Sequence, residues 1–142
     1  MKSDPVYRES FTVPQTAIDL NGHVNNVVYL QWMQDVAIRH SDASGGTKAV
    51  NSVNGMWVAR SHHVEYLNPA FVNDPIAVTT WIASSSRVRV LRRYKFSNTT
   101  NGKVLVKGET DWFFVDRESG RPHAIPDVVT KCFPLLPSDP ES

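Results

Sequence analysis

Three polar residues of different chemistry stand two positions apart in the segment Asp19-Leu20-Asn21-Gly22-His23. They are the carboxylate of Asp19, the amide of Asn21 and the imidazole of His23. In an extended or looping backbone alternate side chains point to the same side, so we expect these three to converge on one pocket. A carboxylate can act as a general base or a nucleophile, and the other two groups can orient it. The spacing therefore indicates a catalytic site.

A helix is expected directly after this segment. Five residues recur at the spacing of one helix face: Tyr29, Trp32, Met33, Val36 and Ala37. They predict a helix from about Asn26 to His40, with Asn25 as its cap. The free N–H groups of a first helical turn favour negative charge. Amides near Val24, Asn25 and Asn26 could thus stabilise the oxyanion of an acyl-transfer reaction.

The remaining segments alternate or cluster β-branched and aromatic residues, which is typical of strands. The predicted strands are Val6–Val13, Met56–Leu67, Ile76–Ala83, Arg87–Ser97 and Val104–Val115. Ser41–Gly55 is small and polar and predicts a loop, and Asp127–Cys132 predicts one helical turn in a proline-rich tail. The fold class is therefore α+β, one domain over residues 1–142, with a mostly antiparallel sheet of about five strands around one long helix. One helix covers one sheet face, and Trp81 and Trp112 lie in strands, so we expect a dimer.

A basic row lies in one predicted strand. Its members are Arg87, Arg89, Arg92, Arg93 and Lys95. Strand alternation places Arg92 on the face opposite to the other four, unless a bulge at Leu91 changes the count. The row is either a solvated face or, through residues such as Arg89 and Arg93, a site for the phosphates of a ligand.

Composition excludes several classes of function. The chain has 142 residues, of which 15 are basic and 14 acidic, so its net charge is +1. A charge this small argues against binding of nucleic acid over the whole surface of the protein. Its single cysteine, Cys132, cannot form an intrachain disulfide, and no stretch is apolar enough for a membrane span. The start lacks the apolar core of a secretion signal, so a cytoplasmic location is the simplest expectation. His62 and His63 are adjacent on a strand and point to opposite faces, and no metal site or cofactor is expected.

Ordinary structural roles remain open for the candidate residues. Asp19 could serve an Asx-turn or a cap, and His23 could bond the loop backbone. Asn25 and Asn26 are favoured as capping residues.

The segment Asp19 to Tyr29, DLNGHVNNVVY, resembles the motif of the hotdog-fold thioesterases. It is similar to 4-hydroxybenzoyl-CoA-thioesterase-like acyl-CoA thioesterases and to plant acyl-carrier-protein thioesterases. The segments Val64–Ala70 (VEYLNPA) and Asp116–Pro122 (DRESGRP) add weaker matches. The resemblance covers about residues 6 to 128 and implies a sheet wrapped around one helix.

The resemblance also implies a function. It gives Asp19 the catalytic aspartate position, adds Asn21 and His23 as catalytic partners, and associates Tyr29 and the start of the helix with substrate binding. The expected reaction is metal-free hydrolysis of an acyl-CoA thioester by a homodimer or homotetramer. An acyl-carrier-protein substrate, and a module that binds acyl thioesters without turnover, are the alternatives. A hotdog hydratase is disfavoured because its Gly-x-Asn-Pro-like loop is missing.

Overall fold

One antiparallel sheet forms the centre of the molecule. The structure, a computed structural model, describes residues 4–140. The sheet has the strand order β1-β3-β4-β5-β2, and all neighbouring strands are antiparallel. The strands are β1 (Val6–Thr12), β2 (Gly55–Tyr66), β3 (Pro75–Ser85), β4 (Arg89–Asn98) and β5 (Val104–Asp116). The predicted α+β class is confirmed, and each strand lies within two residues of its expected bounds.

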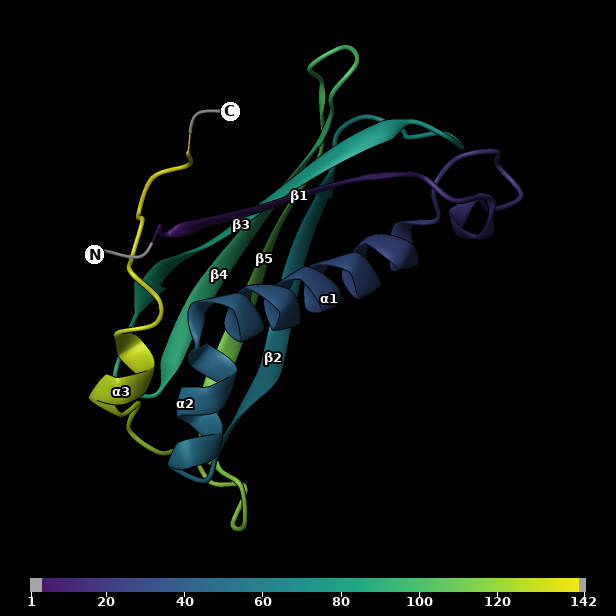
Figure 1. The fold of residues 1–142 in the computed structure, drawn as a ribbon. Coiled ribbons are helices and arrows are strands. Elements are labelled where there is room, and N and C mark those ends of the chain that lie inside the picture. Colours follow the sequence, from purple (N-terminus) through teal and green to yellow (C-terminus); the bar gives the residue numbers. More distant parts are fainter. Residues whose placement is uncertain (1–3, 141–142) are drawn as a thin grey trace.

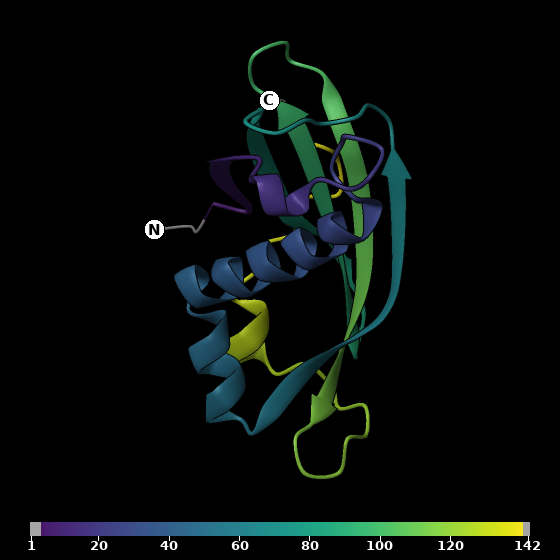
Figure 2. The same ribbon diagram turned by 90° about the vertical axis from the view of Figure 1, so that its right-hand side faces the viewer.

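Helix α1 (Asn26–Ser44) crosses one face of this sheet, as Figures 1 and 2 show. Its buried positions are Tyr29, Met33, Val36, Ala37 and His40. Met33 packs against β5 at Gly108, where an added Cβ would lie 2.9 Å from the Met33 Cε and Sδ atoms. The missing side chain at Gly108 therefore lets the helix approach the sheet closely.

The segment Ser41–Gly55, predicted to be a loop, is largely helical. Helix α1 continues to Ser44, and α2 (Gly46–Ser52) begins after Gly45, whose φ of 85° suits a residue without Cβ. Ala49 and Val50 of α2 are buried in a second apolar cluster beside the sheet. The loop prediction was wrong because these tertiary contacts outweigh the weak helix preference of small polar residues. The short helix α3 (Asp127–Thr130) confirms the helical turn expected in the tail.

The predicted alternation of β4 is confirmed. The buried residues of β4 are Val90, Arg92, Tyr94, Phe96 and Asn98. Arg89, Arg93 and Lys95 alternate with them and face away from α1. The bulge lies in β3, between Ile82 and Ser84, and the β3–β4 pairing has no extra residue at Leu91.

The tryptophans do not form an exposed aromatic surface. Trp81 pairs with Arg93 on the outer face but is only 1% exposed. The C-terminal segment, residues 134–140, passes along this region: the Leu136 N–H donates to the Ile82 carbonyl oxygen at 2.8 Å. Trp112 lies opposite Val90, on the α1 side of the sheet. The part of the dimer argument that rested on these two tryptophans was therefore wrong.

Candidate active site

The segment Asp19–Val24 forms a tight turn. The Asp19 N–H donates to the His23 carbonyl oxygen, and the Gly22 N–H donates to the Asp19 carbonyl oxygen, each at 3.0 Å. Gly22 adopts a φ of 84°, and Asp19 Oδ1 accepts the Asn21 N–H at 2.8 Å. This is the Asx-turn that the sequence left open for Asp19. The backbone of this segment therefore loops rather than runs extended, and the joint catalytic role of Asp19, Asn21 and His23 stays a prediction.

Asn25 caps α1 as predicted. Its side-chain oxygen Oδ1 accepts the Val27 N–H at 2.9 Å. The Val24 N–H donates to the Ala70 carbonyl oxygen and the Asn25 N–H donates to the Ala17 carbonyl oxygen, each at 2.9 Å. Among the described residues the Asn26 N–H has no acceptor, so it is the one of the three expected amides that is available to a ligand.

A cavity of about 190 Å³ opens beside this end of the helix. His23, Val24, Asn26 and Tyr29 line one side, and the end of β2 with the following loop, residues 66–70, lines the other. The Tyr66 hydroxyl donates to the Asn26 carbonyl oxygen at 2.9 Å and ties the two sides together. The two motifs of the resemblance, residues 19–29 and 64–70, thus meet in space.

The cavity includes His23 but neither Asp19 nor Asn21. Asn21 is exposed, whereas His23 is half-buried with its Nδ1 atom 3.5 Å from the Val24 carbonyl oxygen. Asp19 is held next to the cavity through its backbone bond to His23. Tyr66 and Asn68 were not among the predicted site residues, although the Tyr-x-x-Pro-Ala pattern that contains them was the signal for this wall.

Tyr29 lies at the bottom of the same region. It is 2% exposed, and its ring packs edge-on against Trp32, Tyr66 and Phe96. Burial raises the pKa of Tyr29 to about 12, so the phenol is neutral and cannot serve as a base at ordinary pH. Its hydroxyl is buried and has no hydrogen-bond partner among the described residues, so it is an unsatisfied polar group beneath the cavity.

Arg89 and Arg93 lie on the outer face of the sheet and line no cavity with His23. Arg89 Nη2 is 2.6 Å from Asp111 Oδ1, and Arg93 Nη1 donates to the Pro137 carbonyl oxygen at 3.2 Å. Both guanidinium groups therefore already have partners in this chain, and their role in phosphate binding stays a prediction.

Two further features bear on the chemistry. His62 Nδ1 lies 2.8 Å from Thr110 Oγ1, whereas His63 is on the other face near Glu65, as their adjacency predicted. Within residues 4–140 no group of three potential metal ligands occurs.

The candidate active site at the start of α1 offers a helix-terminal amide, an imidazole and a nearby carboxylate. These groups suit the attack of water on a carbonyl carbon.

Comparison with known proteins decides the family. Residues 4–133 match the model of the acyl-ACP thioesterase N-terminal domain. The chain belongs to this family. An acyl-[acyl-carrier-protein] hydrolase of the Cuphea viscosissima chloroplast, FATB3, is 22% identical over 130 residues. This match covers 87% of the chain but 32% of the relative, so the chain spans about a third of the length of the curated relatives it matches.

Solved structures show that this member of the acyl-ACP thioesterase family has the predicted hotdog fold. The probable thioesterase YbaW of Escherichia coli superposes with a TM-score of 0.81 at 16% identity, over 88% of this chain and 94% of that one. A 1,4-dihydroxy-2-naphthoyl-CoA thioesterase of Synechocystis superposes with a TM-score of 0.80 at 14% identity, over 90% and 95%.

None of the helices among residues 4–140 is long and apolar enough to cross a membrane. The cytoplasmic location expected from the sequence stays a prediction.

Proposed function

We propose that this chain hydrolyses an acyl-CoA thioester to a free acid and coenzyme A. The observation that carries the proposal is the turn Asp19–Val24, which leads into the N-terminus of α1, where His23 lines a cavity and the Asn26 N–H has no acceptor among the described residues. Membership of a thioesterase family supports the reaction class.

The chemistry follows from the positions of these groups. The thioester carbonyl oxygen accepts the Asn26 N–H, at the positive end of a 19-residue helix. Asp19 takes a proton from a water molecule, whose oxygen attacks the carbonyl carbon. The tetrahedral oxyanion then collapses, the C–S bond breaks, and the thiolate takes up the proton.

In the second route that the site allows, the Asp19 carboxylate attacks directly and water hydrolyses the resulting mixed anhydride. His23 and Asn21 orient Asp19 or the water in either route. Tyr29 and Val24 line the cavity that receives the acyl group, and Asn25 caps the helix beside it.

The carrier of the acyl group has two candidates. The Synechocystis relative is a CoA thioesterase by name, whereas the Cuphea relative is an acyl-carrier-protein hydrolase. We favour coenzyme A and keep the acyl carrier protein as the alternative. A thiol-release assay with the same acyl group on both carriers separates them, because the wrong carrier gives the lower kcat/KM.

The test of the site is Asp19→Asn, which keeps the size of the side chain and removes its charge. We expect kcat to fall by ~10²–10⁴-fold, the range for the loss of a general base, or more for the loss of a nucleophile. Asp35→Asn is the matched control, because Asp35 is a carboxylate on α1 that accepts a bond from Gln31. A folded Asp19→Asn protein with nearly unchanged kcat would refute the role of Asp19. A wild-type protein that binds acyl thioesters but releases no thiol would instead be a binding module.

We further propose that the active form is a homodimer or a dimer of dimers. β2 is a 12-residue strand at the end of the sheet, and within residues 4–140 it pairs with β5 alone, which leaves its other edge unpaired. A long free edge is a surface that proteins cover. Light scattering at micromolar concentration tests this proposal, and an active monomer would contradict it.

A further inference from the structure

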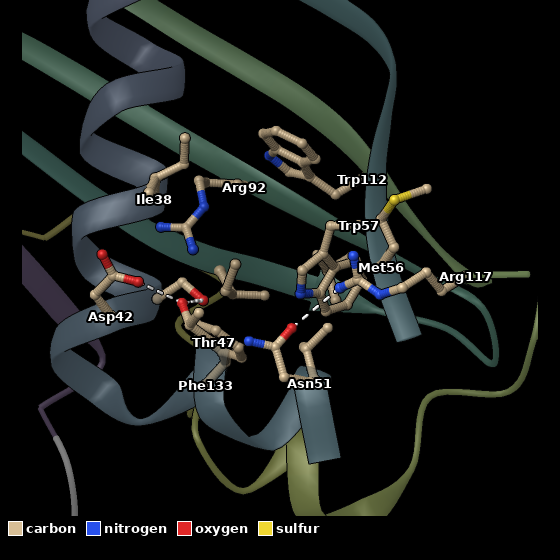
Figure 3. A pocket seen from close by; sticks show the side chains of 15 residues that line it. Ile38, Asp42, Thr47, Asn51, Met56, Trp57, Arg92, Trp112, Arg117 and Phe133 are labelled. Carbon is tan, nitrogen blue, oxygen red and sulfur yellow. Dashed lines mark hydrogen bonds between the residues drawn. The ribbon is translucent and has the colours of Figure 1, made fainter. Parts of the chain in front are cut away.

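A second, larger cavity lies between the C-terminal half of α1, α2 and the sheet (Figure 3). Its volume is about 320 Å³, within the range of cavities that hold small organic ligands, ~300–1,000 Å³. Most of its lining is apolar, including Ala37, Ile38, Val50, Met56, Trp57 and Trp112. Ile38 is 13 residues along α1 from Asn25, so this cavity is about 20 Å from the candidate active site of the same chain.

One buried cation lines this apolar space. Arg92 is 4% exposed and extends from β4 toward α1 (Figure 3). Its Nη1 atom donates to His40 Nδ1 at 2.8 Å and to Thr80 Oγ1 at 3.0 Å. Among residues 4–140 no acceptor binds its Nε or Nη2 atom, and neither atom is sealed in the core. Nε and Nη2 form the edge of a guanidinium that holds a carboxylate with two parallel bonds.

Within residues 4–140 no carboxylate compensates the charge of Arg92, and its Cζ atom lies over the Phe133 ring at 5.9 Å from the centroid. No described carboxylate lies within 4.0 Å of the guanidinium. Asp42 lines the cavity but accepts a hydrogen bond from Thr47. Burial and the neighbouring Arg92 lower the pKa of His40 to about 4, so His40 is a neutral acceptor at ordinary pH. A buried charge without a counterion is costly, and an anion in the cavity would remove that cost.

We propose that this cavity binds a carboxylate with an apolar body, and that the Nε and Nη2 atoms of Arg92 hold the carboxylate. A planar carboxylate matches this edge of the guanidinium, and the apolar walls suit a hydrocarbon chain or ring rather than a nucleotide. Arg117 adds a second positive charge at the wall of the cavity, although it already donates to Asn51 and Gly55.

The carboxylate has two sources. One is a free carboxylic acid, the kind of product that thioester hydrolysis releases. The other is the far end of an acyl group derived from a dicarboxylic acid. In either case the group that binds to Arg92 is a carboxylate.

Calorimetric titration with octanoate and with octanamide tests the proposal directly. The two ligands have the same chain and nearly the same shape, but only octanoate is charged. We expect the wild type to bind octanoate ~10–100-fold more tightly than octanamide, the effect of charge-assisted bonds. Arg92→Met should reduce this preference to about one. Equal affinities of the wild type for both ligands, or a preference that persists in Arg92→Met, would overturn the proposal.

A second variant covers the case in which Arg92→Met does not fold. Ile38 is 57% exposed at the wall of the cavity, so Ile38→Glu introduces a negative charge there without opening the core. It should weaken octanoate binding by roughly threefold or more and leave octanamide binding unchanged. Val72→Glu is the matched control, because Val72 is 39% exposed and lines neither cavity described here. Equal losses of octanoate affinity in the two glutamate variants would overturn the assignment to this cavity.

Turnover assays distinguish the two sources. If the CoA thioester of hexadecanedioic acid, whose extended chain is long enough to span the two sites, has a higher kcat/KM than hexadecanoyl-CoA, and Arg92→Met removes this difference, the carboxylate is the far end of the substrate. If the kcat/KM values are equal while octanoate binding still depends on Arg92, the ligand is a free acid. The titrations need no turnover, so they fail or succeed independently of the proposed hydrolase activity.

Discussion

Protonation of His40 should destabilise the fold in mildly acidic solution. His40 is 4% exposed, stacks on Tyr7 with ring centroids 5.2 Å apart, and accepts a hydrogen bond from Arg92 through Nδ1. Burial, and secondly the positive charge of Arg92, lower the pKa of His40 from 6.5 to about 4, while Asp4 opposes the shift weakly. A proton on Nδ1 would both place two cations side by side and remove the acceptor of the Arg92 hydrogen bond.

The sign and the size of the effect follow from the two pKa values. Below pH 6.5 the unfolded chain binds a proton at His40, whereas the folded chain does not until about pH 4. The free energy of unfolding therefore has its full value above pH 6.5 and falls as the pH decreases toward 4. Between pH 7 and pH 5 the loss from this group alone is about 2 kcal/mol.

Urea unfolding at pH 7, 6 and 5, followed by tryptophan fluorescence at one protein concentration, measures this loss. Glu9 also has a lowered pKa, because of Arg39, but its contribution disappears only below its ordinary pKa of 4.5, outside the range of the experiment. His40→Asn is the matched variant, since an amide oxygen can replace Nδ1 as acceptor and does not titrate. If the wild type and His40→Asn lose the same free energy of unfolding between pH 7 and pH 5, the reasoning about His40 is refuted.

Two further substitutions test packing and charge. Gly55→Ala should lower the free energy of unfolding by about 1–3 kcal/mol, because a Cβ there overlaps the buried ring of Phe114; a loss below ~0.5 kcal/mol in urea unfolding would contradict this. Arg89→Ala and Arg93→Ala should raise KM for an acyl-CoA relative to a short phosphate-free thioester if these residues bind coenzyme A phosphates. If the ratio of the two KM values is the same in the variants as in the wild type, the arginines do not bind the phosphates. Their role would then be structural, through the contacts of Arg89 with Asp111 and of Arg93 with Pro137.

Regular periodicity made most of the fold predictable. The face of α1 that packs on the sheet was recognised from residues spaced three and four apart, and the alternation of β4 placed Arg92 inside. The helical segment after Ser41 was missed because Ala49 and Val50 are too few to form a periodic pattern. Their burial depends on residues distant in sequence, such as Phe133.

The loop before α1 and the cap at Asn25 were predictable from the DLNGHVNN motif, because both depend on local residue types. The detailed geometry of this loop was not predictable, including the turn with a φ of 84° at Gly22. The bonds that occupy the Val24 and Asn25 amides come from Ala70 and Ala17, contacts that no local spacing reveals.

The strand order also determines where the protein can be tethered. β1 forms one edge of the sheet and β2 the opposite edge. The C-terminal segment bridges from Leu135 to Ile82 and then crosses the outer face to β5, where Asp139 Oδ2 lies 3.7 Å from Lys107 Nζ. A label, resin or surface attached through the N-terminal segment, next to β1, is therefore separated from the free edge of β2 by the width of the sheet, whereas an attachment through the C-terminal segment lies nearer to that edge. Protein immobilised through its N-terminal segment should keep the β2 edge accessible, so a surface-capture experiment can titrate a second copy onto it without obstruction from the linker.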